Sequence, residues 1–200
     1  LLNGASMAAT QLHVTNKDVR TPADLKGLKL ISKGEQPLAM IEMGATPIDL
    51  QIGDWYTSLE RGLADGLINH FPVCYVFKIL ELVEHHTIFG DEGATMDMAL
   101  FMMNKDSWDR LPSDLQQVLL DAGKWQDEEI INADIKEIQT AMDAAKAANH
   151  TFNELNEEEL ELWKQAAKPA HDEWIAEFEA KGLPAQKVYD RALELIEEYK

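Results

Sequence analysis

One very long helical segment constrains the fold of this 200-residue chain more than any other feature. Residues 111–114 (LPSD) place a proline and capping-type residues ahead of an apolar periodic run, which is typical of a helix start. From there to about Ala148 only Gly123 interrupts the helical pattern. At about 1.5 Å per residue such a helix is roughly 50 Å long, which exceeds the ~30 Å diameter of a small domain. It therefore needs a neighbour along its whole length, either a coiled-coil partner or two lobes that it crosses.

The apolar positions of this segment favour two lobes, because they do not keep a strict heptad. Two more helices are expected after it, over residues 157–181 and 184–199, with Gly182 as the C-terminal stop between them. The apolar positions considered are Val118, Leu119, Ile130, Ile131, Ile135, Ile138 and Met142.

Ahead of the long helix, short apolar runs alternate with helical segments. We expect strands over residues 28–31, 46–50 and 66–69, with helices over 37–43 and 53–63 between them. Strands that alternate with helices of this length indicate βαβ units and a parallel sheet. A further apolar run, residues 98–103, predicts a strand that is buried on both faces.

Composition excludes several partners. The formal net charge is -18, from 36 acidic and 18 basic side chains. Such a field repels phosphate backbones and anionic lipid surfaces, so we expect no nucleic-acid partner and no membrane surface as a partner. No apolar run approaches the roughly 18 residues of a membrane-spanning helix. The single cysteine, Cys74, cannot form an internal disulfide and is interpreted as a buried small hydrophobe.

No motif indicates enzymatic chemistry. Neither a Gly-x-Ser-x-Gly turn nor a glycine-rich phosphate loop is found, so we expect no enzyme and no cofactor. His85 and His86 are adjacent and do not converge on one ion, so they are interpreted as surface or loop residues and no metal site is expected. His171 is interpreted as part of an exposed helix face. The one titratable pairing that an enzyme would need is His70 with Asp65 or Asp97.

Residues 59–70 form the most informative segment. A helix ends at a glycine, an Asp-Gly turn follows, and a strand ends in Asn69 and His70. In open parallel sheets, ligands bind beyond the carboxyl ends of the strands. Asn69 and His70 would lie there, together with Ile31 and Ser32 at the end of the first strand. A polar loop without a ligand is the alternative, and the residues alone leave it open.

Four segments in register resemble the solute-binding receptors of TRAP (tripartite ATP-independent periplasmic) transporters, the DctP type. Residues 21–30 (TPADLKGLKL) resemble T-P-x-D-L-K-G-L-K-[IL], and residues 43–47 (MGATP) resemble L-G-A-T-P. Residues 54–66 (DWYTSLERGLADG) resemble E-x-Y-x-A-L-Q-x-G-x-x-D-G, and residues 104–112 (NKDSWDRLP) resemble N-K-x-x-W-D-x-L-P. Their order and spacing agree over nearly the whole chain.

The resemblance implies an α/β fragment of the periplasmic-binding-protein type II fold: a parallel or mixed sheet flanked by helices, a long lobe-crossing helix and C-terminal helices. It also implies a periplasmic protein that closes on a small organic solute and passes it to TRAP membrane subunits. The chain lines up with the C-terminal two thirds of such receptors, so most of their first lobe has no counterpart in it. Residues 1–20 would form an inter-lobe strand, 21–92 the second lobe, 93–135 the return to the first lobe, and 136–200 helices that pack on the second lobe.

The resemblance also implies a site and one departure within it. Most of the family binds carboxylates through an arginine directly after the G-L-K-[IL] strand, where this chain has Ile31. A second arginine falls near Gln11, and Lys33, two residues after Ile31, would face the same side if the strand persists past Ser32 and would then supply a cation. We therefore expect a neutral, partly apolar or amino-bearing solute rather than a simple C4-dicarboxylate. The expected ligand-binding residues are Gln11, Ile31, Ser32, Ile52, Trp55, Asn69, His70, Phe71 and Asp97, with Met96 beside the last.

Two alternatives stay open. The missing arginine is also compatible with a receptor that no longer binds a solute. A different class is a structural or regulatory helical protein that self-associates through its C-terminal helices, because a partial α/β lobe exposes apolar surface.

Overall fold

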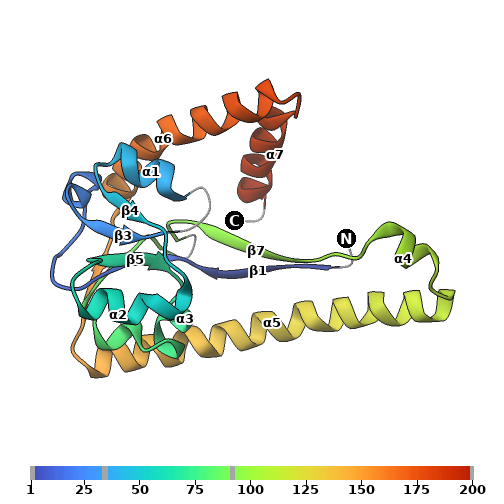
Figure 1. Ribbon diagram of the computed structural model, residues 1–200, viewed down its shortest axis with the longest axis horizontal. Coiled ribbons are helices and arrows are strands. Elements are labelled where there is room, and N and C mark those ends of the chain that lie inside the picture. Colours follow the sequence, from blue (N-terminus) through green and yellow to red (C-terminus); the bar gives the residue numbers. More distant parts are fainter. Residues whose placement is uncertain (1–2, 33–35, 91–92, 199–200) are drawn as a thin grey trace.

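A computed structural model describes residues 3–32, 36–90 and 93–198 of the chain. Its larger sheet has six strands in the order β4-β3-β5-β2-β6-β8. Strands β3, β4 and β5 of this sheet are labelled in Figure 1. β3, β4 and β5 run parallel, as their alternation with helices predicted, and β6 runs parallel to β8. The central strand β2 is antiparallel to both of its neighbours, so the sheet is mixed. The strands are β2 (Gln11–Val14), β3 (Lys29–Ile31), β4 (Thr46–Ile48), β5 (Gly66–Asn69), β6 (His85–Ile88) and β8 (Thr151–Glu154).

Helices cover both faces of this sheet and make, together with it, the part we call the sheet body. One apolar cluster joins α2 and α3 to the C-terminal end of α5, where Ala141 and Ala145 are buried. A second cluster on the other face joins Met40 of α1 to Trp163 of α6. The shorter helical elements are η1 (Pro22–Leu25), α1 (Gln36–Glu42), η2 (Ile52–Asp54), α2 (Trp55–Glu60), α3 (Phe71–Val76) and η3 (Ile79–Glu81).

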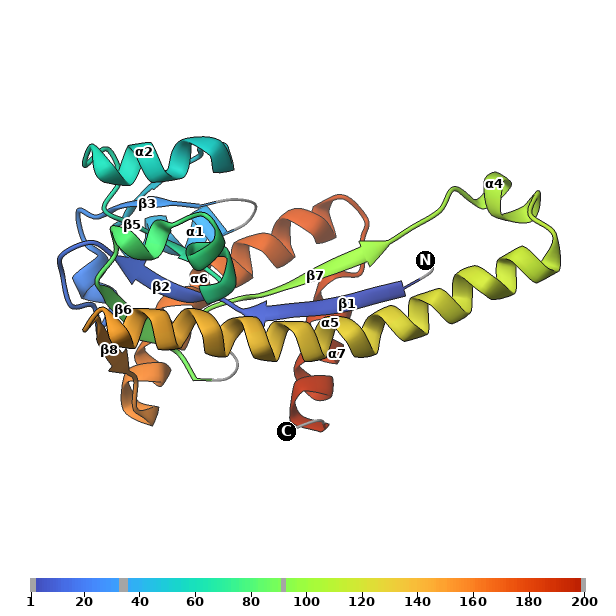
Figure 2. The same cartoon turned by 90° about the horizontal axis from the view of Figure 1, so that it is seen from below.

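The long helix is present as predicted and is α5 (Ser113–Ala147). Its C-terminal end packs against α3 in the sheet body, and the rest extends along a separate two-stranded antiparallel ribbon (Figures 1 and 2). The ribbon consists of β1 (Asn3–Ala9) and β7 (Met96–Phe101), and α4 (Lys105–Asp109) connects it to α5. The helix therefore links the sheet body to the ribbon.

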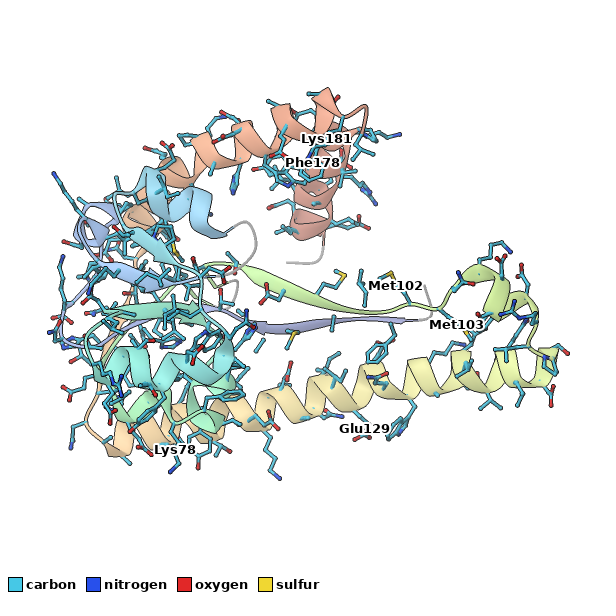
Figure 3. The ribbon with its side chains drawn as sticks, in the orientation of Figure 1. Lys78, Met102, Met103, Glu129, Phe178 and Lys181 are labelled. Atoms are coloured by element: carbon cyan, nitrogen blue, oxygen red, sulfur yellow. The ribbon has the colours of Figure 1, made fainter. Side chains whose placement is uncertain are left out.

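The expectation that residues 98–103 are buried on both faces is wrong. A strand does form there, but Met98, Leu100 and Phe101 are 68%, 47% and 45% exposed. The ribbon contains two strands in the part of the chain that the structure describes, and α5 lies against it through β1, so β7 has a face without cover. Met102 and Met103 lie at the ribbon end far from the sheet body, whereas Glu129 is on the side of α5 turned away from the ribbon (Figure 3).

The C-terminal helices α6 (Glu157–Ala180) and α7 (Ala185–Glu198) also form near the predicted bounds. α6 starts at a capping box in which Asn156 and Glu159 satisfy each other's backbone N–H groups. Gly182 ends the segment with a φ of 77°, a conformation that favours glycine. Phe178 and Lys181 lie together at this turn, with the Lys181 ammonium 4.6 Å from the ring centroid (Figure 3). No helix within the described ranges is long and apolar enough to cross a membrane.

Candidate functional site

The carboxyl ends of β3 and β5 meet at one edge of the sheet, which we call the β3–β5 edge. Ile31 of β3 is in register with Leu67 of β5, so Ser32 and Asn69 both follow closely on neighbouring strands. The antiparallel strand β2 starts at the same edge, where Gln11 is paired with Asn69. The strand-end placement predicted for Ser32 and Asn69 is therefore found in the structure, and Gln11 joins them there.

Two buried polar atoms at this edge have no hydrogen-bond partner among the described residues. They are Ser32 Oγ and His70 Nδ1, on side chains of residues that are only 4% and 5% exposed. A buried polar atom left unpaired costs about 1–3 kcal/mol, so such atoms are rare in folded proteins. Two of them lie on adjacent strand ends, where an additional hydrogen-bonding partner would be stabilising.

The other nitrogen of His70 determines what the free one offers. His70 Nε2 lies 3.2 Å from the Asp97 carboxylate of β7, which joins the sheet body to the ribbon. A carboxylate only accepts, so Nε2 carries the hydrogen and Nδ1 of the neutral ring is an acceptor. A hydroxyl or amino group on a ligand would satisfy it. Asn69 orients the same turn, because its Oδ1 accepts the backbone N–H of His70 at 2.8 Å.

The Gln11 side chain bonds the backbone of a neighbouring segment. Its Nε2 donates to the Gly90 carbonyl at 3.1 Å, and its Oε1 accepts the Phe89 N–H at 2.8 Å. Both ends of the amide are therefore occupied by the backbone of the segment after β6. Gln11 therefore fixes that segment, and its amide retains one N–H and one oxygen lone pair beyond these two bonds.

The expected apolar residues divide between the core and the surface. Ile31, Trp55 and Phe71 are 1%, 5% and 4% exposed and share the apolar cluster below the edge. The Trp55 indole donates to the Leu50 carbonyl at 3.0 Å, which fixes the start of α2. Ile52 lies just before that helix and is 39% exposed. Lys33, the alternative cation, lies outside the described residues.

A cavity of about 490 Å³ adjoins the site between the sheet edge and α5. Gln11 and Phe71 line it, and the other expected site residues do not. The sequence analysis did not predict that Ile138 and Met142 line a cavity. Their spacing shows that they share one face of a helix, but it does not show what lies opposite that face. The remaining lining residues are Ala9, Ile88, Gly90, Glu154 and Leu155.

Three histidines inside the sheet body were also missed or misplaced. The interpretation of His86 as a surface or loop residue is wrong: it is fully buried in β6, because its face of the sheet is covered. His13 of β2 and His150, which precedes β8, form a line with it. The apolar neighbours Leu12 and Val14 could have indicated that His13 lies in a buried strand. The structure buries all four residues of that strand. Cys74 is buried as predicted, and burial raises the pKa of its thiol.

Other titratable groups lie near the site as isolated residues or pairs. Across residues 3–32, 36–90 and 93–198, no group of three or more His, Cys, Asp or Glu side chains is placed to hold a metal ion. His85 instead pairs with Asp18, whose carboxylate is 2.8 Å from His85 Nδ1. Hydrogen bonds from Asn153 and His85 lower the pKa of Asp18.

The family model of the bacterial extracellular solute-binding proteins, family 7, matches residues 2–177. The chain belongs to this family. The C4-dicarboxylate-binding periplasmic protein DctP of Rhodobacter capsulatus is 29% identical over 175 residues, covering 86% of this chain and 52% of that protein. The ectoine-binding periplasmic protein TeaA of Halomonas elongata is 25% identical over 182 residues, covering 88% of this chain and 51% of that protein.

Solved structures confirm the fold. A TRAP solute-binding protein of Rhodoferax ferrireducens with copurified benzoate has a TM-score of 0.86 at 22% identity, covering 98% of this chain and 62% of that one. A marine metagenome TRAP solute-binding protein specific for aromatic acids has a TM-score of 0.84 at 24% identity, covering 100% and 64%. The chain thus spans about half the length of the curated relatives named above and under two thirds of these two structures.

Proposed function

We propose that the chain is the solute-binding component of a TRAP-type transporter, working in the periplasm. It captures a small organic solute at the β3–β5 edge and delivers it to the membrane subunits. The family match and the solved TRAP receptors of the same fold support this role. The relatives are named as solute-binding proteins, and none of the names considered above describes an enzyme.

The observation that carries the proposal is the pair of buried, unpartnered atoms Ser32 Oγ and His70 Nδ1. A solute with a hydroxyl or amino group can donate to His70 Nδ1 and exchange a hydrogen bond with the Ser32 hydroxyl. Asn69 has its side-chain NH2 group as a further donor, and the exposed Ile52 side chain, beside the buried Trp55, is expected to supply an apolar wall. Asp97 holds the His70 ring in the orientation that this requires.

The charges at the edge favour a neutral or amino-bearing solute over a simple C4-dicarboxylate. A guanidinium is the group that binds carboxylates bidentately, and none is positioned at the ends of β2, β3 or β5. The four arginines of the chain are Arg20, Arg61, Arg110 and Arg191. Relatives named for a C4-dicarboxylate and for ectoine indicate that the family accepts solutes of different chemistry.

In this proposal the two structural bodies belong to two lobes that close on the solute. Residues 1–20 form the inter-lobe strand, 21–92 the second lobe, 93–135 the return to the first lobe, and 136–200 the helices that pack on the second lobe. The His70–Asp97 contact lies between the sheet body and the ribbon, so a movement of one lobe relative to the other would change its length.

A thermal-shift screen of the purified protein followed by calorimetry tests the proposal. The panel contains succinate, malate, uronates and aromatic acids beside hydroxylated and amino-bearing neutral compounds. We expect the largest stabilisation from the last two groups, with weak or absent responses to succinate and malate. Tight binding of either dicarboxylate would contradict the proposed solute class, and no response to any compound would contradict the binding function.

A further inference from the structure

Three imidazole rings form a continuous line through the sheet body and end at the backbone of the proposed site. His150 Nδ1 is 3.0 Å from His86 Nε2, and His86 Nδ1 is 2.8 Å from His13 Nδ1. His13 Nε2 is 3.1 Å from the carbonyl oxygen of Asn69. The line therefore runs from the loop after α5 through β6 and β2 to the last residue of β5.

Hydrogen-bond rules give this line a single direction. The Asn69 carbonyl only accepts, so His13 Nε2 donates and, in the neutral ring, His13 Nδ1 accepts. His86 Nδ1 must then donate, which leaves His86 Nε2 as an acceptor for the Nδ1 hydrogen of His150. Neutral rings thus fix one tautomer at each position, and His150 Nε2 is the one ring nitrogen of the three left to bind a proton.

The surroundings keep the inner two rings uncharged. His13 and His86 are fully buried, with Phe71 against His13 at 4.7 Å and Phe152 against His86 at 5.0 Å between ring centroids. Burial lowers the pKa of His13 to about 4 and that of His86 to about 2. Burial also lowers the pKa of His150, which is only half-buried and therefore open to solvent.

Few charged or titratable groups face the line from the neighbouring elements. His70 lies near His13 at the start of α3, and His85 lies near both His86 and His150. Glu84 acts on His150 in the opposite sense to burial, since its charge favours the protonated ring. From α5, the Lys146 ammonium is 5.9 Å from the centroid of the Phe152 ring.

We infer that His13, His86 and His150 are positioning residues that hold the Asn69 backbone through a one-way hydrogen-bond chain with its open end at His150. The chain itself does not depend on the solute, whereas its importance for binding rests on the proposed function. A proton bound at His150 Nε2 makes Nδ1–H a stronger donor, and cooperative polarisation passes that change along the rings to the carbonyl. The protonation state of His150 therefore changes the hydrogen bond to the Asn69 carbonyl at the β3–β5 edge.

Nitrogen-15 NMR of the histidine rings in the solute-free protein tests the direction of the chain. We expect His13 to be protonated at Nε2 alone, and His86 and His150 at Nδ1, at neutral pH. We also expect His13 and His86 to stay neutral down to about pH 5, where an ordinary histidine with a pKa of about 6.5 is charged. The opposite tautomer at any of the three, or charging of His13 near pH 6.5, would overturn the inference.

Variants test whether the chain reaches Asn69. The Asn69 carbonyl carbon and the His70 amide, which share a peptide bond, should titrate with the pKa of His150 in the native protein. His150→Phe should abolish that titration, and His150→Asn, which keeps a donor without a titrating group, should do the same while retaining the native signals of His86. His171→Phe, on an exposed helix face, is the matched control and should leave the titration unchanged.

A titration of the Asn69 carbonyl that persists in His150→Asn with the midpoint of the native His150 ring would contradict the chain, whether or not His150→Phe folds. Because these readings need no solute, they are independent of the thermal-shift screen. A protein that binds none of the tested compounds but shows the expected tautomers would refute the proposed function and leave the chain standing. A protein that binds a compound from the screen but shows other tautomers would support the proposed function and refute the chain.

Discussion

Acidification should destabilise the protein well above the pH at which its carboxylates titrate. An unfolded histidine has a pKa of about 6.5, whereas burial lowers that of folded His13 to about 4. Below pH 6.5 the unfolded chain binds more protons than the folded one. The free energy of unfolding therefore decreases as the pH is lowered. The contribution of His13 is present above pH 6.5 and is lost progressively down to pH 4.

The size of the effect follows from the gap between these values. At about 1.4 kcal/mol for each pKa unit, His13 alone removes roughly 3 kcal/mol between pH 6.5 and pH 4. His86, whose folded pKa is about 2, acts in the same direction throughout this window. Asp18 and Glu159 have lowered pKa values, so their stabilising contributions are lost mainly below the unfolded pKa of such groups, about pH 4.5.

Urea unfolding followed by tryptophan fluorescence at several pH values between 7 and 4.5 measures this dependence. The native protein should lose several kcal/mol over the range, and His13→Gln, which has no titrating ring, should lose clearly less. His171→Gln is the control and should follow the native curve. A free energy of unfolding that is constant over this range, or an equal slope in His13→Gln, would refute the assignment.

Further predictions concern packing and helix docking. A Cβ at Gly66 would lie 2.2 Å from the backbone oxygen of His13, so Gly66→Ala should lower the free energy of unfolding by roughly 3 kcal/mol, whereas Gly53→Ala, with open space at that atom, should change it little in the same urea assay. Arg20 donates twice to Glu159, at 2.7 and 2.8 Å, so Arg20→Gln should speed amide hydrogen exchange in α6 at low salt and less so at high salt; equal exchange rates would show that the pair does not dock the helix.

Local periodicity was sufficient to predict much of the fold. The helix at Ser113–Ala147 and the helix stop at Gly182 follow from spacing and capping within a few turns of chain. The strand at Met96–Phe101 was also recognisable, but its exposure was not. Exposure depends on which distant segments cover a strand. An apolar run has the same sequence pattern whether or not another segment covers it.

The site was predictable in position more than in detail. Asn69, His70 and Ser32 were expected at a strand end because parallel strands carry their polar ends to one edge. The occupied amide of Gln11 and the buried place of His86 depend on pairing between β2 and segments more than 70 residues away. Such partners leave no mark in local spacing, so only the structure reveals them.

Replacing Ser32 tests the central claim, that the unpartnered groups at the β3–β5 edge bind the solute. Ser32→Ala removes a buried hydroxyl that has no partner in the described structure, so the unliganded protein should unfold at an equal or slightly higher temperature. Calorimetry with the strongest compound from the screen should nevertheless show an affinity lower by about three- to tenfold, the value of one hydrogen bond. An affinity in Ser32→Ala equal to that of the native protein would contradict the account, because the variant is expected to stay folded.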